Sequence, residues 1–354
     1  MRIFKFLITL SIGFLLCCQS STDLDSTSPT PPPVQAKHML GVDLSFLPEI
    51  EAEGTTFFDA ENTPQQADEI LKNEGYNTVR LRLWNNPENG HCNLDEVKTF
   101  SNRLKSLGYK VWLDFHYSDS WADPAKQNKP KAWEELSLAA LKDSIYSFTT
   151  IALNEVRPDY VQIGNEINHG MLWPEGNISD QAQFTDLLKE GIKASRDYDK
   201  ELPIILHFAG IEGADWFFGI LKSFNVDYDL IGLSYYPKWH GKDLTDLENK
   251  ITSLQSTHQK KVLIAETAYP FTLGWNDWTN NIIGDESQLI SDFPASPEGQ
   301  KAFLKEIDNI ILRTDAFGWC YWAPDWVAFR GNEATNGSSW ENQALFDFNF
   351  QYLH

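Results

Sequence analysis

The sequence predicts an α/β protein with the fold of a (β/α)8 TIM barrel in a single domain. From Met39 onward, short apolar runs alternate with segments of helical character, which favours a parallel sheet covered by helices. There are eight strand-like runs, and eight repeats indicate a closed barrel, with a doubly wound open sheet as the alternative. The length of 354 residues suits one barrel with inserted loops.

The expected strands are rich in β-branched and aromatic residues, as buried parallel strands are. The longest insertion, Thr272 to Ser296, follows the seventh strand, and the final 30 residues show no clean helical period. The eight strands are expected at residues 40–46, 78–84, 110–117, 160–166, 203–209, 230–236, 261–269 and 318–324.

Capping signals delimit the helices. Thr63-Pro64 is expected to be the N-cap and first residue of one helix, and Asn93 to cap another that stops at Gly108. The remaining helices are expected at 136–155, 180–197, 243–257 and 297–313, the last opened by Ser296-Pro297.

The N-terminus predicts a lipoprotein signal peptide over residues 1–18. The basic start MRIFK precedes an apolar run, Phe6 to Leu16, that is too short to span a bilayer. The run ends in Leu-Leu-Cys-Cys, which resembles the lipobox of bacterial lipoproteins, so we expect a lipid anchor at Cys18 (or Cys17). Plain secretion with later cleavage is the alternative.

The other two parts of the chain follow from composition. Residues 19–37 are rich in Ser, Thr and Pro, as a disordered tether would be, and residues 38–354 form the expected barrel domain. We therefore expect an exported protein, lipid-anchored at the bacterial cell envelope or surface and otherwise secreted, and we expect a monomer.

The composition limits the classes of molecule that the protein is expected to bind. The formal net charge of -21 excludes nucleic acid and favours a neutral glycan over an acidic one. Thirteen tryptophans supply either a bulky core or stacking platforms for sugar rings. Outside the signal region only Cys92 and Cys320 remain, which give no disulfide or metal framework and indicate a free buried thiol at Cys320.

Two glutamates follow expected strands directly. Glu166 comes just after the apolar run Tyr160 to Ile163, and Glu266 lies in the run KVLIAETAYP. One such residue alone is more often a loop charge or an acid at a helix start. Two of them, on the fourth and seventh strands, place carboxyl groups across the mouth of a barrel, where catalytic groups lie. This arrangement predicts hydrolysis of a glycosidic bond, which needs two carboxyl groups.

Other polar residues share faces with these positions. Arg80, Arg82 and Trp84 alternate with leucines on the second strand, so the arginines are expected inside the barrel, paired with carboxylates. A structural salt bridge is the alternative reading of both arginines. His116 shares a face with Asp114 on the third strand, and either lines the site or orients another residue.

Six ordered motifs then carry a family resemblance over residues 40–350. They are TVRLRLW (78–84), LDFHYSDSWADP (113–124), VQIGNEINHGMLWP (161–174), IGLSYYPKWHG (231–241), ETAYPFTL (266–273) and WENQALFDF (340–348). Together they resemble the endo-β-1,4-galactanases of glycoside hydrolase family 53. The resemblance implies an endo-acting, retaining hydrolase that cleaves β-1,4-galactosidic linkages of galactan and type I arabinogalactan by double displacement, without a cofactor.

The resemblance also implies roles for residues. Glu166 would be the acid/base and Glu266 the nucleophile, with the pKa of Glu166 raised and that of Glu266 lowered by Arg80. It further implies that Asn165 binds the sugar 2-hydroxyl group, that Arg80 and Tyr235 contact the nucleophile, that Trp322 floors subsite -1, and that the cleft is lined by His116, Asp119, Trp84 and Trp326.

One departure from the family concerns metal. Some bacterial members hold Ca²⁺ in the loop after strand seven, on closely spaced Asp, His and Asn residues. Here this loop reads GWNDWTNNIIGDESQ, and Asp277 and Asp285 do not reproduce alternating oxygen ligands. We expect no structural metal.

Two other functions stay open on the residues alone. A retaining endo-glycanase acting on mannan or glucan would share the two glutamates. A non-catalytic glycan-binding lipoprotein would share the tether, the acidity and the tryptophans, although binding alone needs no carboxylate pair.

Overall fold

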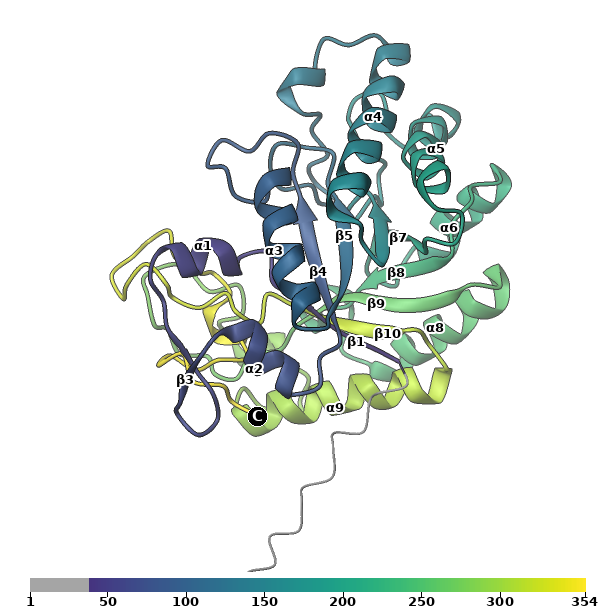
Figure 1. Cartoon of the computed structure of the whole chain (residues 1–354). Coiled ribbons are helices and arrows are strands. Elements are labelled where there is room, and N and C mark those ends of the chain that lie inside the picture. The colour runs from purple at the N-terminus through teal and green to yellow at the C-terminus, as the bar shows by residue number, and fades with distance from the viewer. Residues whose placement is uncertain (1–37) are drawn as a thin grey trace, which may run out of the picture. The chain divides into compact units, whose positions relative to one another are not determined.

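The fold is a closed barrel of eight parallel strands surrounded by helices, which confirms the predicted TIM barrel (Figure 1). It is seen in a computed structural model that describes residues 38–354. The expected signal peptide, lipidated cysteine and tether lie outside these residues. Around the barrel the order is β1-β10-β9-β8-β7-β6-β5-β4, so the last strand closes against the first. Among the described residues, no helix is long and apolar enough to cross a membrane.

The eight expected strand regions all contain a barrel strand. The barrel strands are β1 (Met39–Asp43), β4 (Thr78–Leu83), β5 (Lys110–Phe115), β6 (Tyr160–Ile163), β7 (Ile204–Ala209), β8 (Leu230–Ser234), β9 (Lys261–Thr267) and β10 (Gly318–Trp322). Their register aligns Asp43 with Arg80, Arg82 with Asp114, and Ser234 with Glu266. Polar side chains from distant parts of the sequence therefore meet at one end of the barrel.

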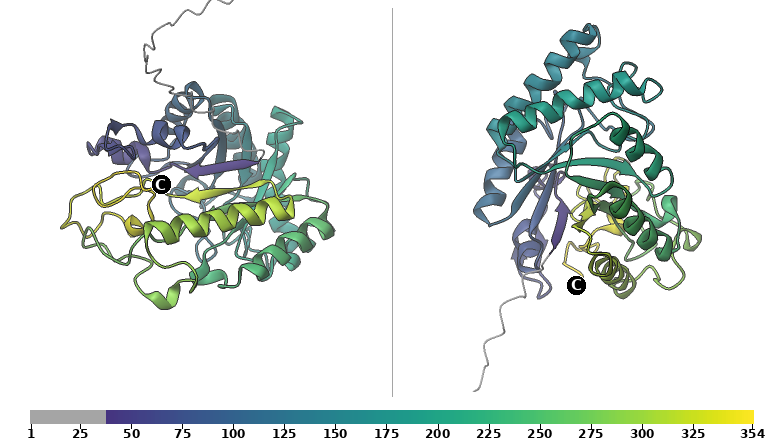
Figure 2. Two further views of the ribbon diagram at one scale, coloured as in Figure 1. Left: turned by 90° about the horizontal axis from the view of Figure 1, so that it is seen from below. Right: turned by 90° about the vertical axis from the view of Figure 1, so that its right-hand side faces the viewer.

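Side-chain caps begin several of the outer helices where the sequence predicts them. Asn93 accepts a hydrogen bond from the backbone N–H of Glu96, and Ser296 accepts one from Gly299. Figure 2 shows α9 running along the outside of the barrel beside β10 and β1. The main helices are α3 (Leu94–Ser106), α4 (Leu138–Val156), α5 (Gln181–Tyr198), α6 (Ala214–Ser223), α8 (Leu244–His258) and α9 (Pro297–Thr314).

The helix expected to open at Thr63-Pro64 begins later. Pro64 belongs to a small hairpin of β2 (Phe57–Phe58) and β3 (Pro64–Gln65), and α2 (Ala67–Asn73) starts after Gln66. The short helices α1 (Leu47–Ala52) and α7 (Pro237–His240), and the whole of α6, have no counterpart in the prediction. The long insertion and the tail hold only the 3₁₀ turns η2 (Glu286–Gln288) and η3 (Glu341–Gln343), and η1 (Lys131–Trp133) precedes α4.

The apolar residues divide into two layers. A small cluster that includes Trp112, Leu263 and Cys320 consists of eight buried residues from seven of the barrel strands, with two from β9 and none from β4. A larger cluster, with Leu81 and Leu83, packs between the strands and the helices. The leucines of β4 therefore face the helices and its arginines face inward, as the period-two pattern predicts. Cys92 and Cys320 are buried, and neither forms a disulfide.

Local backbone irregularities aim the two glutamates into the barrel mouth. Gly164 ends β6 with φ +84, and a Cβ there would lie 2.6 Å from Cγ2 of Ile167, so this turn requires glycine. Glu166 itself has φ +46. On β9, the pairing with β8 shifts by one residue just before Glu266, and such an irregularity re-aims the side chain that follows it.

Candidate active site

A cleft of about 710 Å³ opens at the C-terminal ends of the barrel strands. This end carries the catalytic groups in barrel enzymes. Most of its lining residues are carboxylates, arginines and aromatic rings, with one amide, and they come from strands or loops that are far apart in the sequence. These residues are Asp43, Arg80, Arg82, His116, Trp121, Asp123, Asn165, Glu166, Tyr236, Trp239, His240, Glu266, Trp322, Trp326 and Trp340.

Glu166 and Glu266 face each other across this cleft. One carboxylate oxygen of Glu166, one of Glu266 and a ring nitrogen of His207 all lie within 4.8 Å of one another. Oε1 of Glu166 lies 2.5 Å from the hydroxyl oxygen of Ser234. The sequence therefore predicted correctly that the two strand-end glutamates come together, and their separation is close to the roughly 5 Å of paired carboxylates in retaining glycosidases.

Glu266 is held by Arg80 and Tyr236. Its Oε1 lies 2.8 Å from Nη1 of Arg80, and its Oε2 accepts a hydrogen bond of 2.9 Å from the Tyr236 hydroxyl. The expected contact between Arg80 and Glu266 is present, but the prediction that Tyr235 contacts Glu266 is wrong. The Tyr235 hydroxyl instead donates to the carbonyl oxygen of Gly241 at 2.8 Å, because adjacent residues of an extended chain point to opposite sides.

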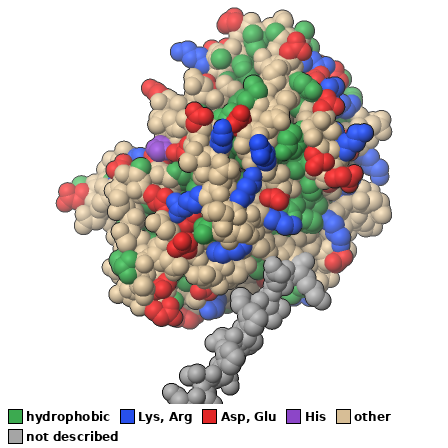
Figure 3. Space-filling model, viewed as in Figure 1, with side chains coloured by type: hydrophobic (Ala, Val, Ile, Leu, Met, Phe, Trp, Pro, Cys, Tyr) green, Lys and Arg blue, Asp and Glu red, His purple; other side chains and the backbone are tan. Residues whose placement is uncertain are grey.

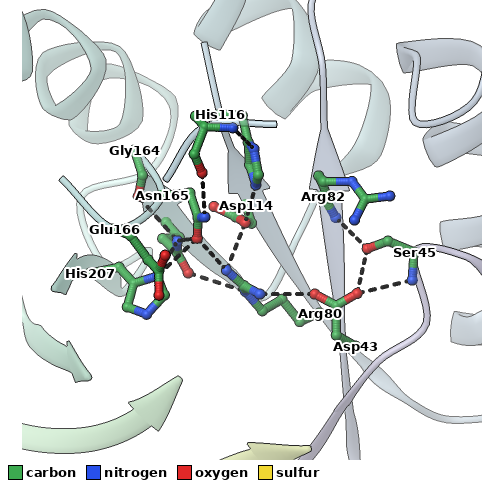
Figure 4. Close-up of polar contacts among 12 residues, drawn as sticks. Asp43, Ser45, Arg80, Arg82, Asp114, His116, Gly164, Asn165, Glu166 and His207 are labelled. Carbon is green, nitrogen blue, oxygen red and sulfur yellow. Dashed lines mark hydrogen bonds and ion pairs between the residues drawn. The ribbon is translucent and has the colours of Figure 1, made fainter. Parts of the chain in front are cut away.

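Arg80 is the centre of a buried polar network (Figure 4). Its guanidinium group also contacts Asp43 at 2.9 Å, Asp114 at 2.8 Å and Oδ1 of Asn165 at 2.7 Å. Such a buried cation needs carboxylate partners, and three surround it. Arg80 therefore fixes Glu266 and Asn165 relative to each other, and His116 steadies Asp114 from behind through a contact of 3.1 Å.

The surroundings shift the pKa values of the two glutamates upward. Burial, followed by the nearby charge of Glu266, raises the pKa of Glu166 to about 8. Burial also raises the pKa of Glu266 to about 7, although the Arg80 guanidinium opposes the rise. The expected fall of the Glu266 pKa below its ordinary value is thus wrong, because burial outweighs Arg80. The order is retained: of the pair, Glu166 keeps its proton to the higher pH.

Aromatic rings line the rest of the cleft. Trp322 and Trp326 lie at the end of β10, and Trp239 of α7 stands half exposed at the edge, with its ring 24° from the plane of Trp340. These positions offer faces on which sugar rings stack. Arg82 lines the cleft between Trp84 and Trp121, with its guanidinium carbon 4.6 Å and 4.0 Å from their ring centroids.

Two residues expected in the cleft lie behind it. The indole nitrogen of Trp84 is 3.3 Å from Nδ1 of His116, which itself lines the cleft. Asp119 accepts hydrogen bonds from the backbone N–H groups of Asn86 and Lys131. Trp84 and Asp119 therefore support the walls of the cleft rather than forming them.

Several residues of the site are not predicted from the sequence. Asp43, Gln162 and His207 are buried members of the network around Arg80 and Asn165. Ser234 pairs with Glu266 in the strand register and contacts Glu166. Period-two alternation from Ser234 would have selected Tyr236, because residues two apart on an extended chain share a face.

The donor atoms near the glutamates are already engaged with other side chains. His207 has hydrogen-bond partners at both ring nitrogens, and Glu266 is paired with Arg80. In the loop after β9, the Asp277 carboxylate accepts from the backbone N–H groups of Thr279 and Ser338, and Asp285 caps η2. None of these carboxylates is arranged as an open metal site of the kind that hard cations prefer.

Comparison with known proteins identifies relatives along nearly the whole described chain. The profile of the family described as Glycosyl hydrolase family 53 matches residues 39–354. An arabinogalactan endo-beta-1,4-galactanase of Cellvibrio japonicus is 38% identical over 325 residues, which are 87% of this chain and 86% of that protein.

Solved structures of the same family share the fold. The GH53 catalytic domain of Ignisphaera aggregans superposes with a TM-score of 0.85 at 37% identity, covering 92% of this chain and 96% of that one. A structure from a study of two fungal beta-1,4-galactanases gives a TM-score of 0.77 at 30% identity, covering 88% and 96%.

Proposed function

The chain belongs to glycosyl hydrolase family 53, and from this premise we propose that it is an endo-acting, retaining hydrolase of β-1,4-galactosidic linkages in galactan and type I arabinogalactan. The observation that carries the proposal is the Glu166–Glu266 pair, with carboxylate oxygens within 4.8 Å at the mouth of the barrel. Its named relatives, among them the Cellvibrio japonicus enzyme, support galactan as the substrate.

In the first step Glu266 acts as the nucleophile. Arg80 and Tyr236 hold its two carboxylate oxygens, so the group is oriented toward the anomeric carbon of the sugar in the cleft. Glu166, which keeps its proton to higher pH, gives that proton to the departing glycosidic oxygen. The anomeric carbon–oxygen bond breaks as the bond to Glu266 forms, which leaves a covalent galactosyl-enzyme.

In the second step water releases the sugar. Glu166, now ionised, takes a proton from a water molecule, whose oxygen attacks the anomeric carbon and displaces Glu266. Two inversions at one carbon retain the configuration. Asn165 is proposed to bind the sugar 2-hydroxyl group, because Arg80 and the Ala122 carbonyl hold its amide at the floor of the cleft.

The test is release of reducing ends from unbranched β-1,4-galactan, with mannan and glucan as comparison substrates. Glu166→Ala and Glu266→Ala are each expected to lower kcat by about 10²-fold or more. The exposed Glu135 provides the control variant Glu135→Ala, which should keep wild-type activity. Near-wild-type rates for both glutamate variants on galactan would refute the assignment.

A mannan- or glucan-specific wild-type enzyme would replace the substrate part of the proposal while leaving the chemistry intact. Binding of galactan without release of product by the wild-type protein would instead favour the non-catalytic glycan-binding function.

We also propose that the chain is exported as a monomer and lipid-anchored at the bacterial cell envelope or surface. The support is the sequence of residues 1–37, with its apolar run and the Cys17-Cys18 pair before a Ser/Thr/Pro-rich segment. Metabolic labelling with a radioactive fatty acid tests it. Incorporation should be lost when Cys17 and Cys18 are both changed to Ala, and labelling that persists would contradict the anchor.

A further inference from the structure

The orientation of the Asn165 amide is fixed by its neighbours. Arg80 has only hydrogen-bond donors, and its Nη2 lies 2.7 Å from Oδ1 of Asn165. Nδ2 of Asn165 lies 2.8 Å from the carbonyl oxygen of Ala122, which can only accept. The amide oxygen of Asn165 therefore faces Arg80, and its nitrogen faces Ala122.

This amide oxygen determines which nitrogen of His207 carries the hydrogen. Nδ1 of His207 lies 2.9 Å from Oδ1 of Asn165. The amide oxygen can only accept, so a hydrogen bond at this distance requires the hydrogen to be on Nδ1. Burial, with Arg80 nearby, lowers the pKa of His207 well below its ordinary value, so the ring holds a single hydrogen. That hydrogen is on Nδ1, and Nε2 is a bare acceptor.

Gln162 offers the alternative arrangement. Its Nε2 lies 3.1 Å from Nδ1 of His207 and could donate to it if the hydrogen sat on Nε2 of the ring. However, Nε2 of Gln162 also lies 3.1 Å from the carbonyl oxygen of Gly164 and 3.2 Å from Oδ1 of Asn165, and these two acceptors use both of its hydrogens. The alternative would also leave the two acceptors, Nδ1 of His207 and Oδ1 of Asn165, in unfavourable contact.

The bare Nε2 of His207 then sets the direction of the Ser234 hydroxyl. Nε2 lies 2.9 Å from Oγ of Ser234, so the single hydroxyl hydrogen points to His207. Oγ is left as an acceptor, and it lies 2.5 Å from Oε1 of Glu166. An O···O contact this short needs a hydrogen, and only Glu166 can supply it.

We infer that His207 and Ser234 are positioning residues that hold the proton on Glu166. In this chain of hydrogen bonds Glu166 donates to Ser234, Ser234 donates to His207, and His207 donates to Asn165. The consequence for catalysis rests on the proposed function. Once Glu166 has given its proton to the departing oxygen, its carboxylate faces a hydroxyl whose hydrogen is turned away. That carboxylate is a stronger base toward the attacking water, which returns the proton in the second step.

Other groups around Glu166 act on the same proton and stay in place when Ser234 or His207 is changed. Glu266 on β9 and Asp123 in the loop after β5 favour the protonated form, and Arg80 on β4 favours the ionised form. The Tyr236 hydroxyl, on the segment after β8, is neutral and engaged with Glu266. A change confined to Ser234 or His207 therefore reports on the inferred chain alone.

The direct test is NMR of the wild-type chain labelled with ¹⁵N-histidine, which requires no activity and so stands even if galactan is not the substrate. The His207 signal, identified by its loss in His207→Phe, should show a hydrogen on Nδ1 and none on Nε2. A hydrogen on Nε2, or on both nitrogens, would overturn the inference.

The kinetic test uses the sign of a pH shift. Ser234→Ala removes the acceptor of the Glu166 proton, so the alkaline limb of kcat/KM on galactan should move to lower pH by about half a unit to one unit. If Ser234 instead donates to the Glu166 carboxylate, the limb moves to higher pH. An alkaline limb that moves to higher pH, or that does not move, refutes the inference.

Two further variants complete the kinetic test. His207→Phe frees the Ser234 hydroxyl to turn toward the Glu166 carboxylate, so the alkaline limb of this variant should also move to lower pH. An unchanged limb would contradict the inferred chain of hydrogen bonds. Ser118→Ala serves as the matched control, because Ser118 is a buried serine that does not line the cleft, and its limb should coincide with the wild-type limb.

Discussion

At the scale of single residues, the site depends on how each carboxylate oxygen of Glu266 is held. Arg80 holds one and Tyr236 the other, at 2.8 Å and 2.9 Å. In the proposed mechanism, this hydrogen bond from Tyr236 weakens as Glu266 attacks, and it is restored when the sugar is released. Tyr236 therefore contacts the proposed nucleophile directly, whereas its neighbour Tyr235 does not.

We predict that Tyr236→Phe lowers kcat/KM on galactan by about tenfold or more, because a hydrogen bond to a charged group contributes roughly 1.5–3 kcal/mol. Tyr235→Phe is the matched control. It loses only the bond to the Gly241 carbonyl, so it should keep wild-type kinetics while the free energy of unfolding falls by about 1 kcal/mol. Equal kinetic losses in both variants would contradict the geometry.

The two glutamates could be predicted from the sequence because each follows a buried strand, and strand ends meet at one edge of a barrel. The network around them could not be predicted in the same way. Asp43, Gln162 and His207 lie within or at the ends of strands, where a polar residue facing inward looks like any other interruption of an apolar run. Their roles depend on which strands become neighbours.

At the scale of elements, the loops that follow the strands decide the shape of the cleft. The short helix α7 places Trp239 at the edge, and the insertion after β9 contributes Ile282 to the lining. Local signals predicted the outer helices with side-chain caps, such as α3 and α9. They missed α6, whose N-cap is Gly213 without a capping side chain, and misplaced α2, because Pro64 suits a hairpin as well as a first helical turn.

A substitution of Trp239 in α7 tests whether the edge of the cleft binds substrate. Its ring is about half exposed, and such a face gains stability when a sugar ring covers it. We predict that Trp239→Ala raises KM for galactan several-fold with little change in kcat, since Trp239 forms no hydrogen bond with either glutamate.

Trp278→Ala is the control for Trp239, because Trp278 is also an exposed tryptophan but does not line the cleft. Its KM should stay at the wild-type value. A fall in kcat for Trp239→Ala without a change in KM would contradict a role in binding alone.

The insertion after β9 is braced by one carboxylate of the tail. Glu341 accepts hydrogen bonds from the backbone N–H of Asn276 at 2.7 Å and of Asp277 at 3.1 Å, and from the Asn281 side chain at 3.2 Å. Removing it leaves these donors unpaired, among them the buried N–H of Asp277, at a cost of about 1–3 kcal/mol. We predict that Glu341→Ala increases protease cleavage within residues 272–284 and raises KM, because Ile282 of this loop lines the cleft.

The exposed Glu333 provides the comparison for that experiment. Glu333 lies beside Ala334, whose carbonyl oxygen accepts hydrogen bonds from Trp278 and Thr279 of the same loop. Glu333→Ala should leave both the cleavage rate and KM unchanged. If Glu341→Ala were as resistant to protease as the wild-type chain, the brace would not control the loop.

At the scale of the whole molecule, the barrel gathers titratable groups from across the sequence into one buried centre. Glu166, just after β6, and Glu266, in β9, have pKa values of about 8 and about 7, above the ordinary 4.5, and burial is the largest cause of both. Such groups favour catalysis at the expense of stability, a common feature of active sites. The cost depends on pH, because only the ionised forms are penalised by burial.

The sign of this dependence gives the last prediction. Because the folded chain binds the protons of Glu166 and Glu266 more tightly than the unfolded chain, the free energy of unfolding should fall as pH rises from about 4.5 to about 8. Glu166→Gln removes one titration, so at pH 8 its free energy of unfolding should exceed the wild-type value by about 1 kcal/mol or more, and the gain should vanish near pH 4.5. Urea denaturation at each pH measures it, with Glu135→Gln as the exposed control. Parallel curves for Glu166→Gln and the wild type would show that the buried charge is stabilised elsewhere in the fold.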